Sequence, residues 1–155
     1  RMRPDAVIDM VDDWHVGIDI AFGRSEIGPR RLAYFGLSMG STFGMPMLAQ
    51  REDVIVSALG LMGTTGGLSH RRATLLDAAS KITHPVLYVM QLDDEFLPRD
   101  GYLELFDAIA SEDKRLHANP GLHGEVPPEE LLFAFEFMKH HIESRAAEPV
   151  ADGSA

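Results

Sequence analysis

The sequence predicts an α/β fold with a mostly parallel sheet of about four strands flanked by helices. Two observations support this prediction. Short apolar segments alternate along the chain with longer segments whose apolar residues recur every three or four positions. The short segments do not alternate polar with apolar residues, as is typical of parallel strands covered on both faces. Because helix-linked parallel strands end at one edge of the sheet, any site is expected at that edge.

The first half of the chain opens with a helix over residues 5–22, whose apolar residues share one face while its aspartates lie outside that face. A short apolar run predicts a strand at 32–36. A helix over 41–50 follows, and Pro46 is expected to kink or shorten it. The next strand, at 53–61, is apolar almost throughout, which indicates a position inside the sheet.

The second half repeats this alternation and closes with a helix. Pro128 suits the first turn of that last helix, because the N–H that proline lacks would have no partner there. Residues 146–155 are small and polar and are expected to form a disordered tail, which leaves residues 1–145 as a single domain. The expected elements are a loop at 63–67, a helix at 69–80, a strand at 86–91, a helix at 99–110, a strand at 114–118 and a helix at 129–144.

Composition limits the function classes. A chain of 155 residues with 45% hydrophobic and 25% charged residues is typical of one globular domain. A formal net charge of −10 argues against nucleic acid or an anionic membrane as a partner. The absence of cysteine excludes disulfides and thiolate metal sites. No apolar run is long enough to span a membrane, and the N-terminus lacks the apolar core of a signal peptide, so we expect a cytoplasmic protein.

The most informative motif is Gly36-Leu37-Ser38-Met39-Gly40, which lies between a predicted strand and a predicted helix. Strand, G-x-S-x-G and helix together form the nucleophile elbow. The tight turn forces the serine toward positive φ, and glycines at 36 and 40 are expected to remove collisions with it. The turn would hold the Ser38 hydroxyl at a helix N-terminus, where the Met39 N–H is free to bind a developing oxyanion.

Two later segments supply partners for such a serine. The strand at 86–91 leads into an acidic cluster, Asp93-Asp94-Glu95, and a carboxylate just past a strand end can orient a histidine on a neighbouring loop. After the last predicted strand, His123 lies in a turn-rich loop between Gly121 and Gly124. The chain order serine, acid, histidine is that of the α/β-hydrolases. Each residue also has a structural explanation, since acids cap helices and loop histidines bond to backbone.

On these motifs the chain resembles the α/β-hydrolases, and among them the dienelactone-hydrolase-like serine esterases. The resemblance is carried by residues 34–40, 93–98 and 120–124 and extends from about residue 5 to about residue 142. In such hydrolases the acid usually lies four residues before a proline, which favours Asp94 over Asp93 here. Dienelactone hydrolases proper use a cysteine nucleophile, so the serine in this chain implies ordinary ester hydrolysis.

The resemblance implies a Ser38–His123–Asp94 triad that transfers an acyl group to water, with the Met39 N–H in the oxyanion hole. No metal or organic cofactor is needed for that chemistry. A small carboxylic ester is the expected substrate. The residues expected to line its pocket are Leu37, Phe43, Leu61, Met62 and Phe96.

The chain also departs from the family pattern. A full α/β-hydrolase has several strands before the helix at 5–22, and a loop among them supplies a second oxyanion N–H. Nothing resembling that Gly-rich loop precedes Ser38. The first strand would then expose an apolar edge, and we expect another chain, most simply a second copy in a homodimer, to cover it. The alternative function is a weak or inactive hydrolase half-domain that serves as a dimeric binding or scaffold protein.

Overall fold

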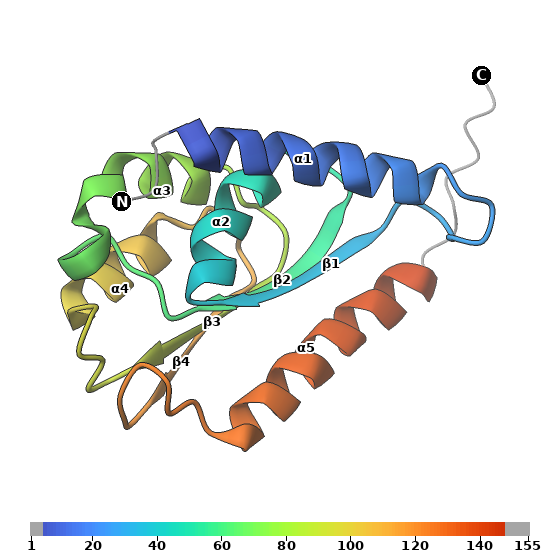
Figure 1. Ribbon diagram of the computed structural model, residues 1–155. Coiled ribbons are helices and arrows are strands. Elements are labelled where there is room, and N and C mark those ends of the chain that lie inside the picture. Colours follow the sequence, from blue (N-terminus) through green and yellow to red (C-terminus); the bar gives the residue numbers. More distant parts are fainter. Residues whose placement is uncertain (1–4, 148–155) are drawn as a thin grey trace.

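Four parallel strands form one sheet in the order β1-β2-β3-β4, so neighbours in the sheet are also consecutive in the chain. The computed structural model describes residues 5–147 (Figure 1). The strands are β1 (Leu32–Leu37), β2 (Val54–Gly60), β3 (Val86–Gln91) and β4 (Lys114–Asn119). The helices are α1 (Asp5–Phe22), α2 (Met39–Leu48), the 3₁₀ helix η1 (Gly66–Arg71), α3 (Arg72–Ala79), α4 (Arg99–Ala108) and α5 (Pro128–Ala147).

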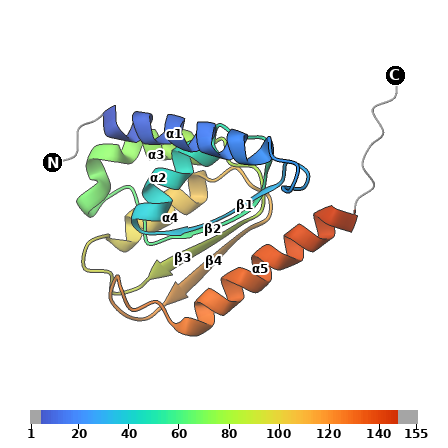
Figure 2. The same cartoon turned by 45° about the vertical axis from the view of Figure 1, so that its right-hand side comes forward.

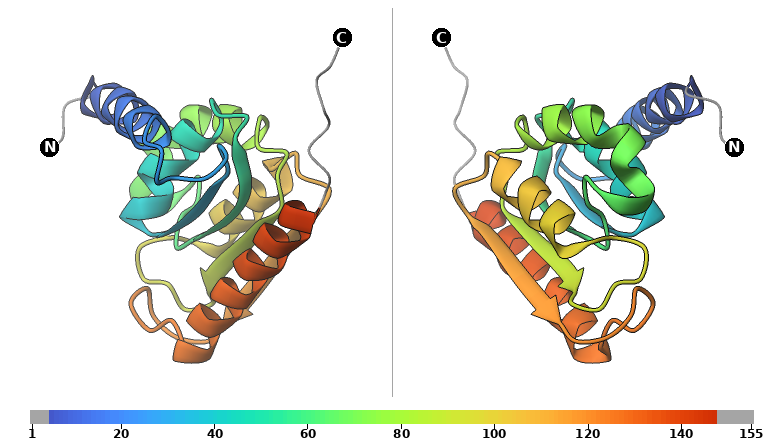
Figure 3. Two further views of the ribbon diagram at one scale, coloured as in Figure 1. Left: turned by 90° about the vertical axis from the view of Figure 1, so that its right-hand side faces the viewer. Right: turned by 90° about the vertical axis from the view of Figure 1, so that its left-hand side faces the viewer.

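The helices form a layer on each face of the sheet. The first four α-helices, α1 to α4, cover one face, and α5 lies alone on the other (Figures 2 and 3). Each strand-to-strand connection therefore crosses over the same face, as expected for right-handed crossovers between neighbouring parallel strands. The predicted α/β fold with a four-stranded parallel sheet is confirmed.

Several boundaries differ from the predictions by one or two residues, including the end of α4 at Ala108, and three helices differ in an informative way. The helix predicted at 41–50 starts two residues earlier and ends at Leu48, two residues after Pro46, which lies inside it. The helix predicted at 69–80 is divided into η1 and α3. The first residue of η1, Gly66, has a φ of 61°, and the Gly67 N–H donates to the Phe96 carbonyl at 3.2 Å. This contact with the loop after β3 fixes a tight turn at the end of the predicted loop, and the 3₁₀ helix that starts there runs into the region predicted as α-helix. Helix α5 continues to Ala147, into the predicted tail, and the rest of that tail lies outside the described residues.

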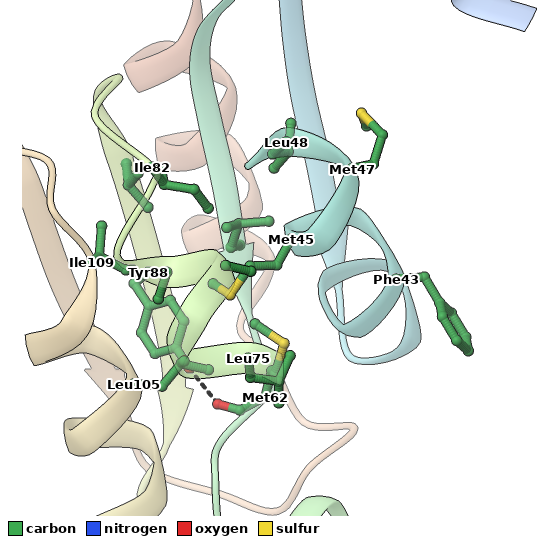
Figure 4. Close-up of a cluster of buried hydrophobic side chains, with 14 of the residues drawn as sticks. Phe43, Met45, Met47, Leu48, Met62, Leu75, Ile82, Tyr88, Leu105 and Ile109 are labelled. Atoms are coloured by element: carbon green, nitrogen blue, oxygen red, sulfur yellow. Dashed lines mark hydrogen bonds between the residues drawn. The ribbon is translucent and has the colours of Figure 1, made fainter. Parts of the chain in front are cut away.

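Two apolar clusters hold the layers together. The larger lies between the sheet and helices α1 to α4, and Tyr88 of β3 crosses it to donate a hydrogen bond to the Met62 carbonyl (Figure 4). The smaller lies under α5 and joins Ala134, Phe137 and Met138 to β2 and β3. Central strands covered on both faces explain why their sequences show no alternation.

Strand β1 lies at one edge of the sheet. The N–H groups of Leu32 and Ser38 donate to carbonyls in and next to β2, at 2.8 and 2.9 Å. Because backbone polar groups alternate along a strand, those of Ala33, Phe35 and Leu37 point away from the sheet. Phe35 is 37% exposed and stacks on Phe135 of α5, with ring centroids 5.4 Å apart. Within the described residues, no strand pairs with this edge, so it is free to pair with a further strand.

A search of the helices within residues 5–147 finds none long and apolar enough to cross a membrane.

Candidate active site

Ser38 follows directly on the end of β1 and precedes the first residue of α2. Its backbone has a φ of 54° and a ψ of −113°, a conformation that residues other than glycine rarely adopt and that marks stored strain. The turn is fixed by the Thr42 N–H and hydroxyl, which both donate to the Ser38 carbonyl at 3.0 Å. The Ser38 side chain is thereby held above the carboxyl edge of the sheet.

The two motif glycines differ in what their positions require. A Cβ on Gly36 would lie 2.8 Å from Cε1 of Tyr34 and 3.0 Å from the carbonyl carbon of Gly40. Gly36 therefore does relieve a collision, but with Tyr34 and the Gly40 backbone and not with Ser38 as predicted. A Cβ on Gly40 would meet nothing within 4 Å. The prediction for Gly40 is wrong, because the position of its Cβ faces open space and not Ser38.

Gly60, at the end of β2, braces the turn from the neighbouring strand. Its carbonyl accepts the Ser38 N–H at 2.9 Å, and its N–H donates to the Ser41 hydroxyl at 2.8 Å. The buried Ser41 hydroxyl donates in turn to the Gly36 carbonyl at 2.5 Å. A Cβ on Gly60 would collide with the backbone of Val89 in β3. Neither Gly60 nor Ser41 was singled out from the sequence, because their partners become visible only once the strands are aligned.

Three side chains from three loops meet at this edge. The Ser38 hydroxyl lies 2.7 Å from Nε2 of His123. On the other side of the ring, Nδ1 of His123 lies 2.7 Å from Oδ2 of Asp94. The His123 side chain is 18% exposed and the Asp94 side chain is fully buried. The three residues that the motifs predicted as partners are therefore joined by consecutive hydrogen bonds, from Ser38 through His123 to Asp94.

Asp94 accepts four hydrogen bonds, two on each oxygen. Oδ1 accepts the N–H groups of Phe96 and Leu97 at 2.9 and 3.0 Å. Oδ2 accepts the hydroxyl of Tyr102 as well as His123. Burial by itself would raise the pKa of Asp94, but the bonds from Tyr102, His123 and the Phe96 N–H outweigh burial and hold that pKa below its ordinary value. Asp94 is thus kept as a carboxylate.

The other two acids of the cluster bind the loop that carries the histidine. Oδ2 of Asp93 accepts the Gly121 N–H at 3.2 Å, and Oε2 of Glu95 accepts the His123 N–H at 2.8 Å. Gln91, buried at the end of β3, donates hydrogen bonds from its side-chain amide to two backbone carbonyls of the same loop. The resemblance favoured Asp94 over Asp93 as the partner of the ring. In the structure Asp94 contacts the ring, and its neighbours contact the backbone around it.

The residues predicted to line a pocket lie in different environments. Leu37 is partly buried and packs under α5. Phe43, Leu61 and Met62 are 9%, 6% and 0% exposed and lie on the side of α2 and α3. Phe96 alone is open, at 60% exposure, with its ring edge-on to His123 at a centroid distance of 5.4 Å.

Two further exposed apolar side chains, which were not among the predicted pocket residues, complete the surroundings. Met39 is 68% exposed directly after the serine, and Leu122 is 46% exposed directly before the histidine. Together with Phe96 they are exposed apolar residues on the three loops that carry the triad, one on each loop, and we call these three residues the apolar rim. In the sequence, only their positions next to Ser38 and His123 could have indicated that these side chains lie near the site. Among residues 5–147 no three His, Asp or Glu side chains gather as metal ligands would.

Neither a protein-family model nor a curated protein matches the sequence. Solved structures do match. The chain is 35% identical to a PEG-bound cold-adapted esterase from an Arctic intertidal metagenomic library, over 84% of this chain, with a TM-score of 0.77. It belongs to the α/β-hydrolase superfamily. The zinc-bound structure of such an esterase matches 87% of this α/β-hydrolase chain at 34% identity, with a TM-score of 0.79.

A more distant neighbour shows the fold alone. The match to the monoacylglycerol lipase of Paleococcus ferrophilus covers 88% of this α/β-hydrolase chain and 75% of the lipase chain. The two are 12% identical, and the TM-score is 0.68. The chain spans 54% and 59% of the two esterase chains. The structure therefore corresponds to part of a longer esterase chain, in agreement with the truncated α/β-hydrolase fold predicted from the sequence.

Proposed function

We propose that this chain is a serine esterase that cleaves small carboxylic esters through an acyl-enzyme. The observation that carries the proposal is the unbroken line of hydrogen bonds from Ser38 through His123 to Asp94, with 2.7 Å on each side of the ring. Similarity to the cold-adapted esterases, at 35% and 34% identity, supports ester hydrolysis in general. A dienelactone-hydrolase-like specificity remains a prediction from the sequence, as does a cytoplasmic location.

Acylation begins with attack of the Ser38 oxygen on the ester carbonyl carbon. Nε2 of His123 takes the hydroxyl proton as the C–O bond forms, and Asp94 stabilises the resulting imidazolium. The negative charge moves to the carbonyl oxygen. The Met39 N–H is one of the first N–H groups of α2, which have no partner inside the helix, so it can donate to that oxygen. The imidazolium then gives its proton to the departing alcohol.

Deacylation reverses these roles with water. His123 takes a proton from the water molecule that attacks the acyl carbon, and the proton returns to the Ser38 oxygen as the carboxylic acid leaves. The apolar rim around the serine favours substrates with short apolar groups on either side of the ester. Because Phe96 lies edge-on to His123, it would contact the group bound next to the ring.

The free edge of β1 is where a second oxyanion donor could be supplied. Removing one such donor typically lowers rates about 10²- to 10³-fold, so an efficient enzyme needs one beyond the Met39 N–H. The outward-facing backbone of Ala33, Phe35 and Leu37 can pair with an incoming strand. A second copy of this chain is the simplest source, and light scattering should show a dimer. A well-folded monomer at all concentrations would rule out the homodimer.

The alternative, a hydrolase half-domain that binds without turnover, makes a different prediction. A fluorophosphonate probe should label Ser38 in either case, because labelling needs only an activated serine. Labelling without ester turnover would favour the half-domain. Turnover together with labelling, both absent in Ser38→Ala, supports the esterase. A stable oligomer with neither property would favour a scaffold protein.

A further inference from the structure

Tyr102 joins the candidate site from α4, a helix whose sequence carries no catalytic motif. Its side chain is fully buried, and its hydroxyl donates to Oδ2 of Asp94. That oxygen is the same one that faces Nδ1 of His123 at 2.7 Å. Two donors from different elements therefore share a single oxygen of the carboxylate.

We propose that Tyr102 is a positioning residue for the triad acid. Its hydroxyl fixes the Asp94 carboxylate and weakens the hydrogen bond between Oδ2 of Asp94 and Nδ1 of His123. This inference rests on the proposed esterase function but makes its own structural claim. Tyr102 acts through Asp94 and has no contact with the ester in this account.

The carboxylate geometry supports this role. An ionised carboxylate offers about four lone-pair positions, and Asp94 uses two on each oxygen. The backbone N–H groups of Phe96 and Leu97 hold Oδ1, so the carboxylate cannot rotate without breaking several bonds. Because Oδ2 divides its negative charge between two donors, each bond is weaker than it would be alone. Burial and the adjacent Asp94 both raise the pKa of Tyr102, so its hydroxyl keeps the proton that it donates.

The start of α4 is held firmly enough to keep the Tyr102 hydroxyl in place. Gly101 packs so closely on the segment after β2 that a Cβ there would lie 2.7 Å from the backbone nitrogen of Thr65. The Thr64 N–H donates to the Gly101 carbonyl at 3.2 Å. The Tyr102 ring also meets the ring of Tyr88 edge-on, with centroids 6.3 Å apart.

Tyr88 provides a matched control. It is also fully buried, in the same cluster, and its hydroxyl donates to the Met62 carbonyl and not to the triad (Figure 4). Tyr102→Phe and Tyr88→Phe each remove one buried hydroxyl and one hydrogen bond. Both variants should lose stability, and only Tyr102→Phe should change how the ring responds to pH.

The first test is the pH dependence of kcat/KM for p-nitrophenyl butyrate. In Tyr102→Phe the undivided charge of Oδ2 stabilises the imidazolium more, so the midpoint of the acid limb should rise by about 0.5 pH unit or more. We expect kcat to fall about tenfold with KM nearly unchanged, because the acid is less well oriented. Tyr88→Phe should keep the wild-type midpoint. Equal midpoints in all three proteins would overturn the proposal.

A second readout does not need turnover. The Nδ1 proton of His123 should give a low-field proton NMR signal, identified by its loss in His123→Gln. Tyr102→Phe should move that signal further downfield and Tyr88→Phe should not. If the signal moves but the wild type cleaves no ester, the esterase function fails while the role of Tyr102 stands. A signal that stays in place in Tyr102→Phe would contradict the proposal even in an active enzyme.

Discussion

Asp94→Asn is expected to lower kcat for p-nitrophenyl butyrate by about 10³- to 10⁴-fold with little effect on folding. The amide has nearly the same shape as the carboxylate, so the loop can keep its structure. It carries one oxygen in place of two, however, and four donors point at this side chain. If the two backbone N–H groups keep the oxygen, the NH₂ group faces the His123 ring and drives the neutral ring toward the wrong tautomer.

The neighbouring acids serve as controls for this prediction. Asp93→Asn and Glu95→Gln each weaken one bond to the backbone of the histidine loop, at Gly121 and His123. We expect losses in kcat of about threefold to tenfold, because a single loop contact contributes about 1 kcal/mol. A loss in Asp93→Asn as large as that in Asp94→Asn would contradict the assignment of the triad acid.

Gly60→Ala should lower the free energy of unfolding by about 3 kcal/mol, measured by urea denaturation, and should also abolish activity. The new Cβ would lie 2.9 Å from both the backbone nitrogen and the Cβ of Val89 and closer still to its carbonyl oxygen. Because these atoms belong to the adjacent strand of the sheet, they cannot move aside as an exposed side chain could. The strand would shift and break the bonds from Gly60 to Ser38 and Ser41.

Gly40→Ala is the matched substitution with the opposite expectation. Its Cβ would enter open space, and alanine favours the helix by up to about 1 kcal/mol over glycine. Stability and kcat should stay at or above wild-type values. If Gly40→Ala unfolds the protein while Gly60→Ala does not, the account of how the turn is braced is wrong.

Much of the fold could be predicted from the sequence because parallel strands buried on both faces leave a plain apolar signature. The strands at 86–91 and 114–118 and the helix at 5–22 lie within a residue of their predicted bounds. The helix at 69–80 was predicted less well. In the structure a 3₁₀ helix that begins at Gly66 precedes α3. It is fixed by a contact with Phe96, which lies in a loop about 30 residues further along the chain.

The candidate site shows the same division. Ser38 and His123 are flanked by glycines that mark tight loops, so local sequence was enough to single them out. Among three adjacent acids, only the position four residues before a proline, as in similar hydrolases, favoured Asp94, and the loop backbone is what turns Asp94 toward the ring. Tyr102 and Gly60 act across elements, through a helix start and a strand register, and neither relation is visible in a single sequence.

The most direct test of Ser38 as the nucleophile is hydrolysis of p-nitrophenyl acetate and butyrate by the wild type and by Ser38→Ala. We expect saturable turnover by the wild type and a loss of about 10³-fold or more in the variant, down to the uncatalysed background. Circular dichroism of both proteins would show that the fold is retained. Equal rates for the two folded proteins would mean that Ser38 is not the nucleophile, and the proposed esterase mechanism would have to be abandoned.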